Sequence, residues 1–151
     1  MRLPALDVTL APTSAARRRS IDPTPYIETG NFWASCTPIV LDRHLKETSN
    51  AARQVEIEAL IRRACVNIGI PEPIRIIAGK HSAIEGSPSA YPSGAAPRWM
   101  RWRVPESLAS RQLIHAILEF EDEVSGPVIL GAGRFVGLGM CRPLRRTGTR
   151  Q

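Results

Sequence analysis

The sequence predicts an α+β domain in which an antiparallel sheet packs against one main helix. Apolar residues recur at helical spacing over residues 50–68, and they alternate with polar residues over residues 113–121. The chain has 151 residues, but residues 1–31 and the Gly/Pro/Ser/Ala-rich residues 81–97 have no sustained apolar period. Roughly 100 residues remain, which is enough for one compact two-layer domain.

The predicted helix over residues 50–68 has both of its ends marked. Ser49 or Asn50 can cap its first turn, and Gly69 and Pro71 follow its last turn. One apolar face is formed by Ile57, Leu60, Ile61, Ala64, Cys65 and Ile68. This face is expected to cover the sheet.

The predicted strands span residues 32–41, 74–78, 113–121 and about 135–141, with a hairpin arm that includes a strand over residues 98–104. Pro38 restricts the first strand to an edge or to a position without a ladder donor. The apolar face of residues 113–121 is formed by Ile114, Ala116, Leu118 and Phe120. Gly126 and Pro127 begin a turn or short helix whose apolar residues, Val128, Ile129 and Leu130, are expected to be buried. The order of strand, helix, strand, strand, short helix and strand is that of a ferredoxin-like or RRM-like fold.

Charge makes nucleic acid the first partner to consider. The net charge is +6, the pI is near 10, and eighteen arginines accompany two lysines. Guanidinium groups bind phosphate in a bidentate manner and stack on bases. Codon bias in a GC-rich genome explains the same ratio, so the ratio by itself leaves both explanations open.

The cysteines and the hydropathy pattern exclude other classes. Three widely spaced cysteines form neither a disulfide framework nor a cysteine-based zinc site, which favours a reducing cytoplasm. No run of 18 apolar residues predicts a membrane span, and no apolar signal-peptide region follows the N-terminus. We expect an extended or disordered arm over residues 1–31, one domain over residues 32–143 and a basic tail over residues 144–151.

The most informative motif is the glycine-rich segment over residues 131–139. Its glycines are Gly131, Gly133, Gly137 and Gly139, with Arg134 between them. Rows of amide groups without neighbouring Cβ atoms bind phosphate, and the arginine adds a charged contact. The spacing fits neither a dinucleotide fingerprint nor a P-loop. A tight turn with glycines that serve close packing remains the alternative.

Residues 126–143 resemble the C-terminal glycine-rich loop of the CRISPR-associated RAMP superfamily. More specifically, they are similar to the subtype I-U (also called I-G) protein that fuses a backbone-capping module to a repeat-RNA endoribonuclease module. Residues 37–44, 69–73 and 115–131 support the resemblance, which covers residues 32–143. The chain is expected to be a C-terminal part, because most of an N-terminal half of the fused family is missing.

The resemblance implies a role in antiviral defence, with CRISPR repeat RNA and the other subunits of a type I surveillance complex as partners. It also implies cleavage of precursor crRNA by attack of the ribose 2′-OH, without a metal or other cofactor. A histidine suits these proton transfers. His44 is the first candidate because Arg43 and Lys46 flank it, and His115 is the second because it lies on the polar face of its strand. A metal site is not expected from three dispersed histidines.

Other RNA contacts are expected from Trp99, Arg101 and Arg103, which form an aromatic and basic stripe, although a solvated edge explains the same pattern. His81 is a weaker catalytic candidate because a mobile loop holds catalytic geometry poorly. Two alternative functions remain open. One is a non-catalytic subunit that holds the crRNA handle, and the other is a small protein-interaction domain with structural glycines.

Overall fold

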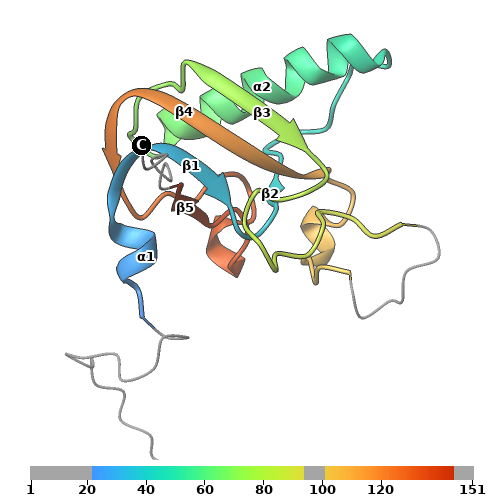
Figure 1. The fold of residues 1–151 in the computed structure, drawn as a ribbon. Helices are drawn as coiled ribbons and strands as arrows, with labels where there is room; N and C mark the ends of the chain where they lie inside the picture. Colours follow the sequence, from blue (N-terminus) through green and yellow to red (C-terminus); the bar gives the residue numbers. More distant parts are fainter. Residues whose placement is uncertain (1–21, 94–100, 145–151) are drawn as a thin grey trace, which may run out of the picture.

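The computed structural model of the chain describes residues 22–93 and 101–144 (Figure 1). In chain order the elements are helix α1 (Thr24–Ile27), strands β1 (Thr29–Ser35) and β2 (Ile39–Val40), helix α2 (Asn50–Asn67), strand β3 (Arg75–Gly79), the 3-10 helix η3 (Glu106–Leu108), strand β4 (Leu113–Ser125), the 3-10 helix η4 (Arg134–Val136) and strand β5 (Cys141–Pro143). The fold is therefore α+β with one main helix, as predicted.

The long strand β4 organises a curled antiparallel sheet. Leu118 of β4 pairs with Trp33 of β1 and with Ile76 of β3, so these two strands flank β4 on opposite edges. Trp33 also pairs with Pro143 of β5. The strand order is therefore β3-β4-β1-β5, and the short strand β2 pairs with the first residues of β4. Figure 1 shows α2 running along one face of this sheet.

Helix α2 confirms the prediction made from residues 50–68. The hydroxyl oxygen of Ser49 accepts a hydrogen bond from the amide of Ala52 at 3.3 Å, which caps the first turn. At the other end Gly69 adopts φ +82°, and the amides of Gly69 and Ile70 donate to the carbonyls of Val66 and Cys65. These paired bonds are those of a Schellman motif, which explains why the helix ends here.

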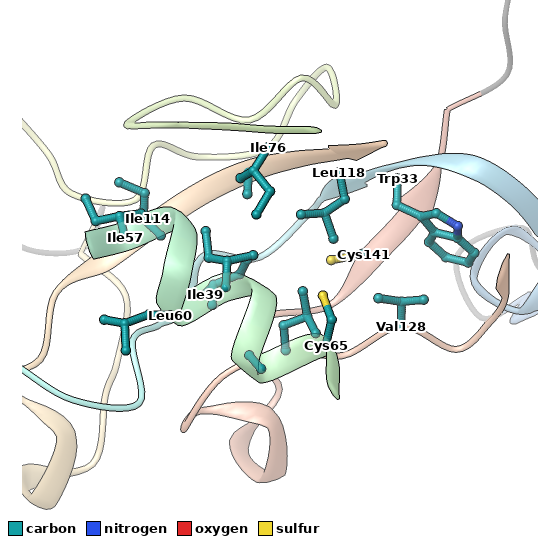
Figure 2. Packing of buried hydrophobic residues seen from close by; sticks show 14 of the residues in the cluster. Trp33, Ile39, Ile57, Leu60, Cys65, Ile76, Ile114, Leu118, Val128 and Cys141 are labelled. Carbon is teal, nitrogen blue, oxygen red and sulfur yellow. The ribbon is translucent and has the colours of Figure 1, made fainter. Parts of the chain in front are cut away.

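The core lies between α2 and the sheet (Figure 2). The helix contributes Ile57, Leu60, Ile61, Ala64 and Cys65, all buried. From β4 come the four residues predicted from alternation: Ile114, Ala116, Leu118 and Phe120. Trp33 and Leu118 are fully buried in the same cluster. Burying side chains of this size stabilises the fold by about 1.5–3 kcal/mol each, so this layer is the main source of stability.

The first predicted strand, residues 32–41, is interrupted in the structure. Strand β1 already begins at Thr29, within the segment expected to be an arm, and ends at Ser35. The amides of Cys36 and Thr37 both donate to the carbonyl of Met140, at 2.7 and 3.3 Å, instead of to β4. Since Pro38 then lacks an amide hydrogen, pairing with β4 resumes only at Ile39.

Two other strand predictions are wrong. Residues 101–104 are not in a strand. The neighbour of β4 is β3 instead, and the indole of Trp102 donates to the carbonyl of Ser89. Residues 98–100 of the predicted strand lie outside the described part of the chain. The last strand is β5, and the residues expected to begin it form η4. After the cis bond between Gly126 and Pro127 the chain is not helical. Val128 and Leu130 are buried as expected, whereas Ile129, also expected to be buried, is half-buried.

Candidate nucleic-acid interface

The glycine-rich segment, residues 131–139, folds back onto strand β2. Gly131 forms a parallel bridge with Val40, and the amide of Ala132 donates to the carbonyl of Val40 at 2.9 Å. The amide of Gly139 donates to the carbonyl of Pro38, also at 2.9 Å. Two hydrogen bonds therefore fasten both ends of this segment to the strand next to it.

Several amides that were expected to bind phosphate are already occupied. The amides of Arg134, Val136 and Leu138 donate to carbonyls of Gly131 and Gly133 within the segment. With those of Ala132 and Gly139, at least five of the nine amides of residues 131–139 donate to the chain's own carbonyls. The predicted phosphate site is therefore limited to the other amides of the segment.

Three of the four glycines have a packing reason. A Cβ atom would lie 2.3 Å from the carbonyl oxygen of Val40 at Gly131, and 1.8 Å from that of Leu130 at Gly139. At Gly133 it would lie 2.7 Å from the side chain of Val40. At Gly137 the space is open, but φ is +81°, a conformation that favours glycine. The tight-turn alternative accounts for this part of the motif.

The tip of the segment is η4, which presents an exposed cation and an exposed ring. Phe135 is 84% exposed, far more than an apolar side chain with only a packing role. The guanidinium of Arg134 lies 4.5 Å from the centre of the Phe135 ring and donates to the carbonyl of Gly131. An aromatic face next to a positioned cation can stack a base and contact its phosphate. The residue that the sequence reasoning missed is Phe135, whose signal was an aromatic side chain inside a glycine-rich turn.

A second segment, residues 42–48, leaves the end of strand β2 and carries two basic and two acidic side chains: Arg43, Lys46, Asp42 and Glu47. Arg43, His44 and Lys46 are all exposed there. The amides of Lys46 and Glu47 donate to the carboxylate of Glu56 on α2, and these bonds lower the pKa of that carboxyl. The segment is thus fastened to the helix by its backbone, and its basic side chains face solvent.

His115 occupies a different place from the one expected. It is 1% exposed, although it was predicted to lie on an open sheet face. Its Nε2 lies 3.0 Å from the carbonyl oxygen of Pro88, so Nε2 carries the proton and donates. Its Nδ1 then accepts from the hydroxyl of Ser35 at 2.9 Å, and that hydroxyl oxygen accepts from the amide of Ala116 at 3.0 Å. The neutral ring is fully bonded.

Burial lowers the pKa of His115 below its ordinary value, although its bonds to Pro88 and Ser35 act in the opposite direction. A buried, neutral and fully bonded imidazole has no open face for RNA. The period of β4 placed His115 opposite Ile114 and Ala116 correctly, but the loop over residues 80–93 covers that face. The catalytic prediction for His115 therefore lacks the accessible geometry it needs.

The predicted stripe of Trp99, Arg101 and Arg103 is placed only in part. Arg101 and Arg103 are exposed and follow one another around the half-buried Trp102, while Trp99 lies outside the described residues. The indole of Trp102 donates to the carbonyl of Ser89 at 2.8 Å. The two arginines are therefore held next to the 80–93 loop, outside any strand.

The three candidate segments, residues 42–48, 80–93 and 131–139, lie at one end of the sheet. Val40, the last residue of β2, pairs with Leu113, and Gly79, the last residue of β3, pairs with His115. The segments that follow these two strands, residues 42–48 and 80–93, both leave the sheet where β4 begins. Since residues 131–139 are bridged to Val40, all three candidate segments are anchored at this end.

Among residues 22–93 and 101–144, no group of three or more His, Cys, Asp or Glu side chains is placed to hold a metal ion. Within the same ranges, no helix is long and apolar enough to cross a membrane. The three cysteines are free thiols.

The sequence matches a known protein family over most of its length. The sequence model described as "CRISPR-associated protein, GSU0054 family" matches residues 8–143. The chain belongs to this family of CRISPR-associated proteins. No curated protein and no solved structure matches the chain. The family confirms the CRISPR association that the resemblance predicted, while the RAMP class and the subtype remain predictions.

Proposed function

We propose that the chain is an RNA-binding RAMP subunit of a type I CRISPR system, of the I-U or I-G subtype, and that it recognises repeat RNA. The family supports the CRISPR context. The strand order β3-β4-β1-β5, with α2 in the crossover between β1 and β3, supports a ferredoxin-like domain. Its partners are crRNA and the other subunits of a surveillance complex, in the cytoplasm.

The observation that carries this proposal is the exposed tip formed by Arg134 and Phe135. The tip is fastened to β2 through Gly131, and the basic residues Arg43 and Lys46 follow the same strand. One strand thus carries a stacking ring and several cations at the same end of the sheet. Such a surface binds single-stranded RNA through base stacking and phosphate contacts. The packed glycines Gly131, Gly133 and Gly139 position this tip, and phosphate contact by the remaining backbone of the segment is part of the proposal.

Cleavage of the bound RNA is the second part of the proposal. An accessible histidine takes the proton from the ribose 2′-OH, and a neighbouring cation stabilises the charge on the phosphate. The sequence placed this chemistry on His44, with Lys46 or Arg43 as the cation. All three side chains are exposed, and replacing each of them by alanine tests the hypothesis. If the chain binds RNA without cutting it, its function is that of the non-catalytic subunit that holds the crRNA handle.

A protein-interaction domain with structural glycines is the competing function, and the packing of the glycines on β2 favours it. Salt dependence separates the two classes, because an RNA-binding chain that contacts several phosphates loses affinity steeply as salt rises. Absence of RNA binding at 50 mM salt by the full chain would leave the protein-interaction function in place.

The test compares three variants of the tip by fluorescence anisotropy with the repeat RNA. Phe135→Ala should weaken binding by about 5- to 150-fold, which corresponds to about 1–3 kcal/mol for a base stacked on an aromatic ring. Arg134→Ala should also weaken it. Val136→Ala is the matched control, since Val136 lies in the same turn and is 49% exposed but has no ring or charge. Equal affinities for all three variants and the wild type would place the RNA elsewhere.

A further inference from the structure

The loop over residues 80–93 is held in place by several contacts. The hydroxyl of Ser82 donates to the carbonyl of Ser35 in β1. The carbonyl of Pro88 accepts from the buried His115, and the amide of Ala90 donates to the carbonyl of Lys80 at 2.8 Å. Ala90 itself is 2% exposed. The loop is therefore docked on the sheet and closed on itself, although its composition predicted mobility.

The docked loop holds the side chains of two consecutive residues, His81 and Lys80, through separate partners. The Nδ1 of His81 lies 3.1 Å from the hydroxyl oxygen of Ser89. The ammonium of Lys80 donates to the hydroxyl of Ser93 at 3.2 Å and lies 5.1 Å from the centre of the Tyr91 ring. His81 is exposed and Tyr91 is 46% exposed. The loop thus positions an imidazole through Ser89 and, on the preceding residue, an ammonium through Ser93. Metal-independent attack on a phosphodiester uses a proton-transfer group and a cation of these kinds.

We propose that His81, oriented by Ser89, is the proton-transfer group of the RNA cleavage, and that Lys80 stabilises the charge on the phosphate. This inference rests on the proposed function, because it assigns residues to the cleavage of bound RNA. It replaces His44 in that role. His44 has no hydrogen bond within the part of the chain that the structure describes, so nothing there fixes the orientation of its ring. His115 is buried and fully bonded.

The proposed reaction balances without a further reagent. With Nδ1 bonded to Ser89, the Nε2 of His81 takes the proton of the 2′-OH as that oxygen attacks phosphorus. A bond forms between phosphorus and O2′, and the bond between phosphorus and the 5′-oxygen of the next nucleotide breaks. The leaving oxygen takes a proton from water, and the imidazolium of His81 returns its proton to solvent, while the ammonium of Lys80 stabilises the charge on the phosphate. The products are a 2′,3′-cyclic phosphate and a 5′-hydroxyl end.

Single-turnover cleavage of the repeat RNA, with chelator present, tests the assignment. His81→Ala should slow cleavage by about 10²–10⁴-fold, the usual loss for a general acid–base group. His44→Ala tests the rival assignment, and Glu85→Ala is the matched control, because Glu85 is exposed in the same loop and has no role in the proposed reaction. Ser89→Ala removes the partner of Nδ1 and should reduce the rate less than His81→Ala. Lys80→Ala should reduce the rate with the same products.

RNA affinity, measured on the same variants, distinguishes a failure of the His81 assignment from a failure of the proposed function. RNA affinity should change little in His81→Ala, because phosphate contacts from many arginines dominate it. A His81→Ala protein that cuts at the wild-type rate overturns the inference, as does loss of cleavage in His44→Ala alone. Wild-type chain that binds but never cuts overturns it too, while RNA binding stands. Wild-type chain that does not bind RNA overturns the proposed function together with the inference.

A second readout does not depend on the rate. The imidazole proton signals of the three histidines are followed by NMR during titration with repeat RNA in which 2′-O-methyl groups block the attacking hydroxyls. The signal of His81 should shift most on binding, and that of the buried His115 least. A shift confined to His44 contradicts the assignment even where cleavage is slow.

Discussion

Replacing Gly131 by alanine should destabilise the fold more than the same replacement at Gly137. The two glycines have the same backbone conformation, with φ of 82° and 81°. An alanine in this left-handed region costs about 1–2 kcal/mol relative to its preferred conformations. Because this strain is common to the two variants, the difference between them reports only the contacts of the added methyl group.

The added methyl group has close neighbours at Gly131 but none at Gly137. At Gly131 the added Cβ lies 2.3 Å from the carbonyl oxygen of Val40 and 2.8 Å from a side-chain carbon of Ile39, while at Gly137 nothing lies within 4 Å. The backbone at Gly131 must therefore move away from β2 and strain the hydrogen bond from Ala132. Overpacking costs about 1–3 kcal/mol and a lost hydrogen bond about 1 kcal/mol. We expect losses of about 1–2 kcal/mol for Gly137→Ala and about 3–6 kcal/mol for Gly131→Ala.

Urea denaturation with linear extrapolation measures both losses. For a chain of this length, 1 kcal/mol corresponds to about 2–4 °C in Tm, so thermal unfolding resolves the same difference. Equal losses for the two variants would refute the reasoning, since they would mean that Gly131 does not pack against β2. The tip at Arg134 and Phe135 would then lack the anchor that the proposed RNA surface requires.

Two further predictions concern buried groups. Because burial lowers the pKa of His115, the unfolded chain binds more protons than the folded chain between the folded value and the ordinary value near 6.5. Stability should be retained above about pH 7 and fall as the pH drops below 6.5, by at most about 1.4 kcal/mol per pH unit, and an equally steep fall in His115→Gln would contradict this origin. Burial raises the pKa of all three thiols, that of Cys65 to about 12. Because Cys36 is partly exposed while Cys65 and Cys141 are buried, a thiol reagent at neutral pH should modify Cys36 first, as mass spectrometry of the labelled peptides will show.

Local periodicity predicted the parts of the fold that local residues determine. Helix α2 follows from an apolar face with a serine cap and a terminal glycine, and these signals lie within the segment itself. The buried face of β4 likewise follows from the alternation over residues 113–121. In both cases the element and its buried face were predictable together.

The candidate site was less predictable because it depends on contacts between distant segments. Alternation correctly placed His115 opposite the apolar face, but the covering loop is fixed by a bond to Pro88, 27 residues earlier. The glycine-rich segment was recognised, yet its packing on β2 depends on Val40, far away in the sequence. Composition marked the 80–93 loop as mobile, while Ser35 and His115 hold it on the sheet.

The same contacts separate the proposed RNA-binding tip from the proposed catalytic histidine. The tip at Phe135 is fastened to β2 through the backbone of residues 131–139, whereas His81 is fastened to β1 and β4 through Ser35 and His115. The two segments meet different strands at one end of the sheet, so a change in one need not displace the other. A surface for RNA affinity and a positioned histidine can therefore be altered independently. This independence is why substitutions at the tip should act on affinity and substitutions at His81 on rate.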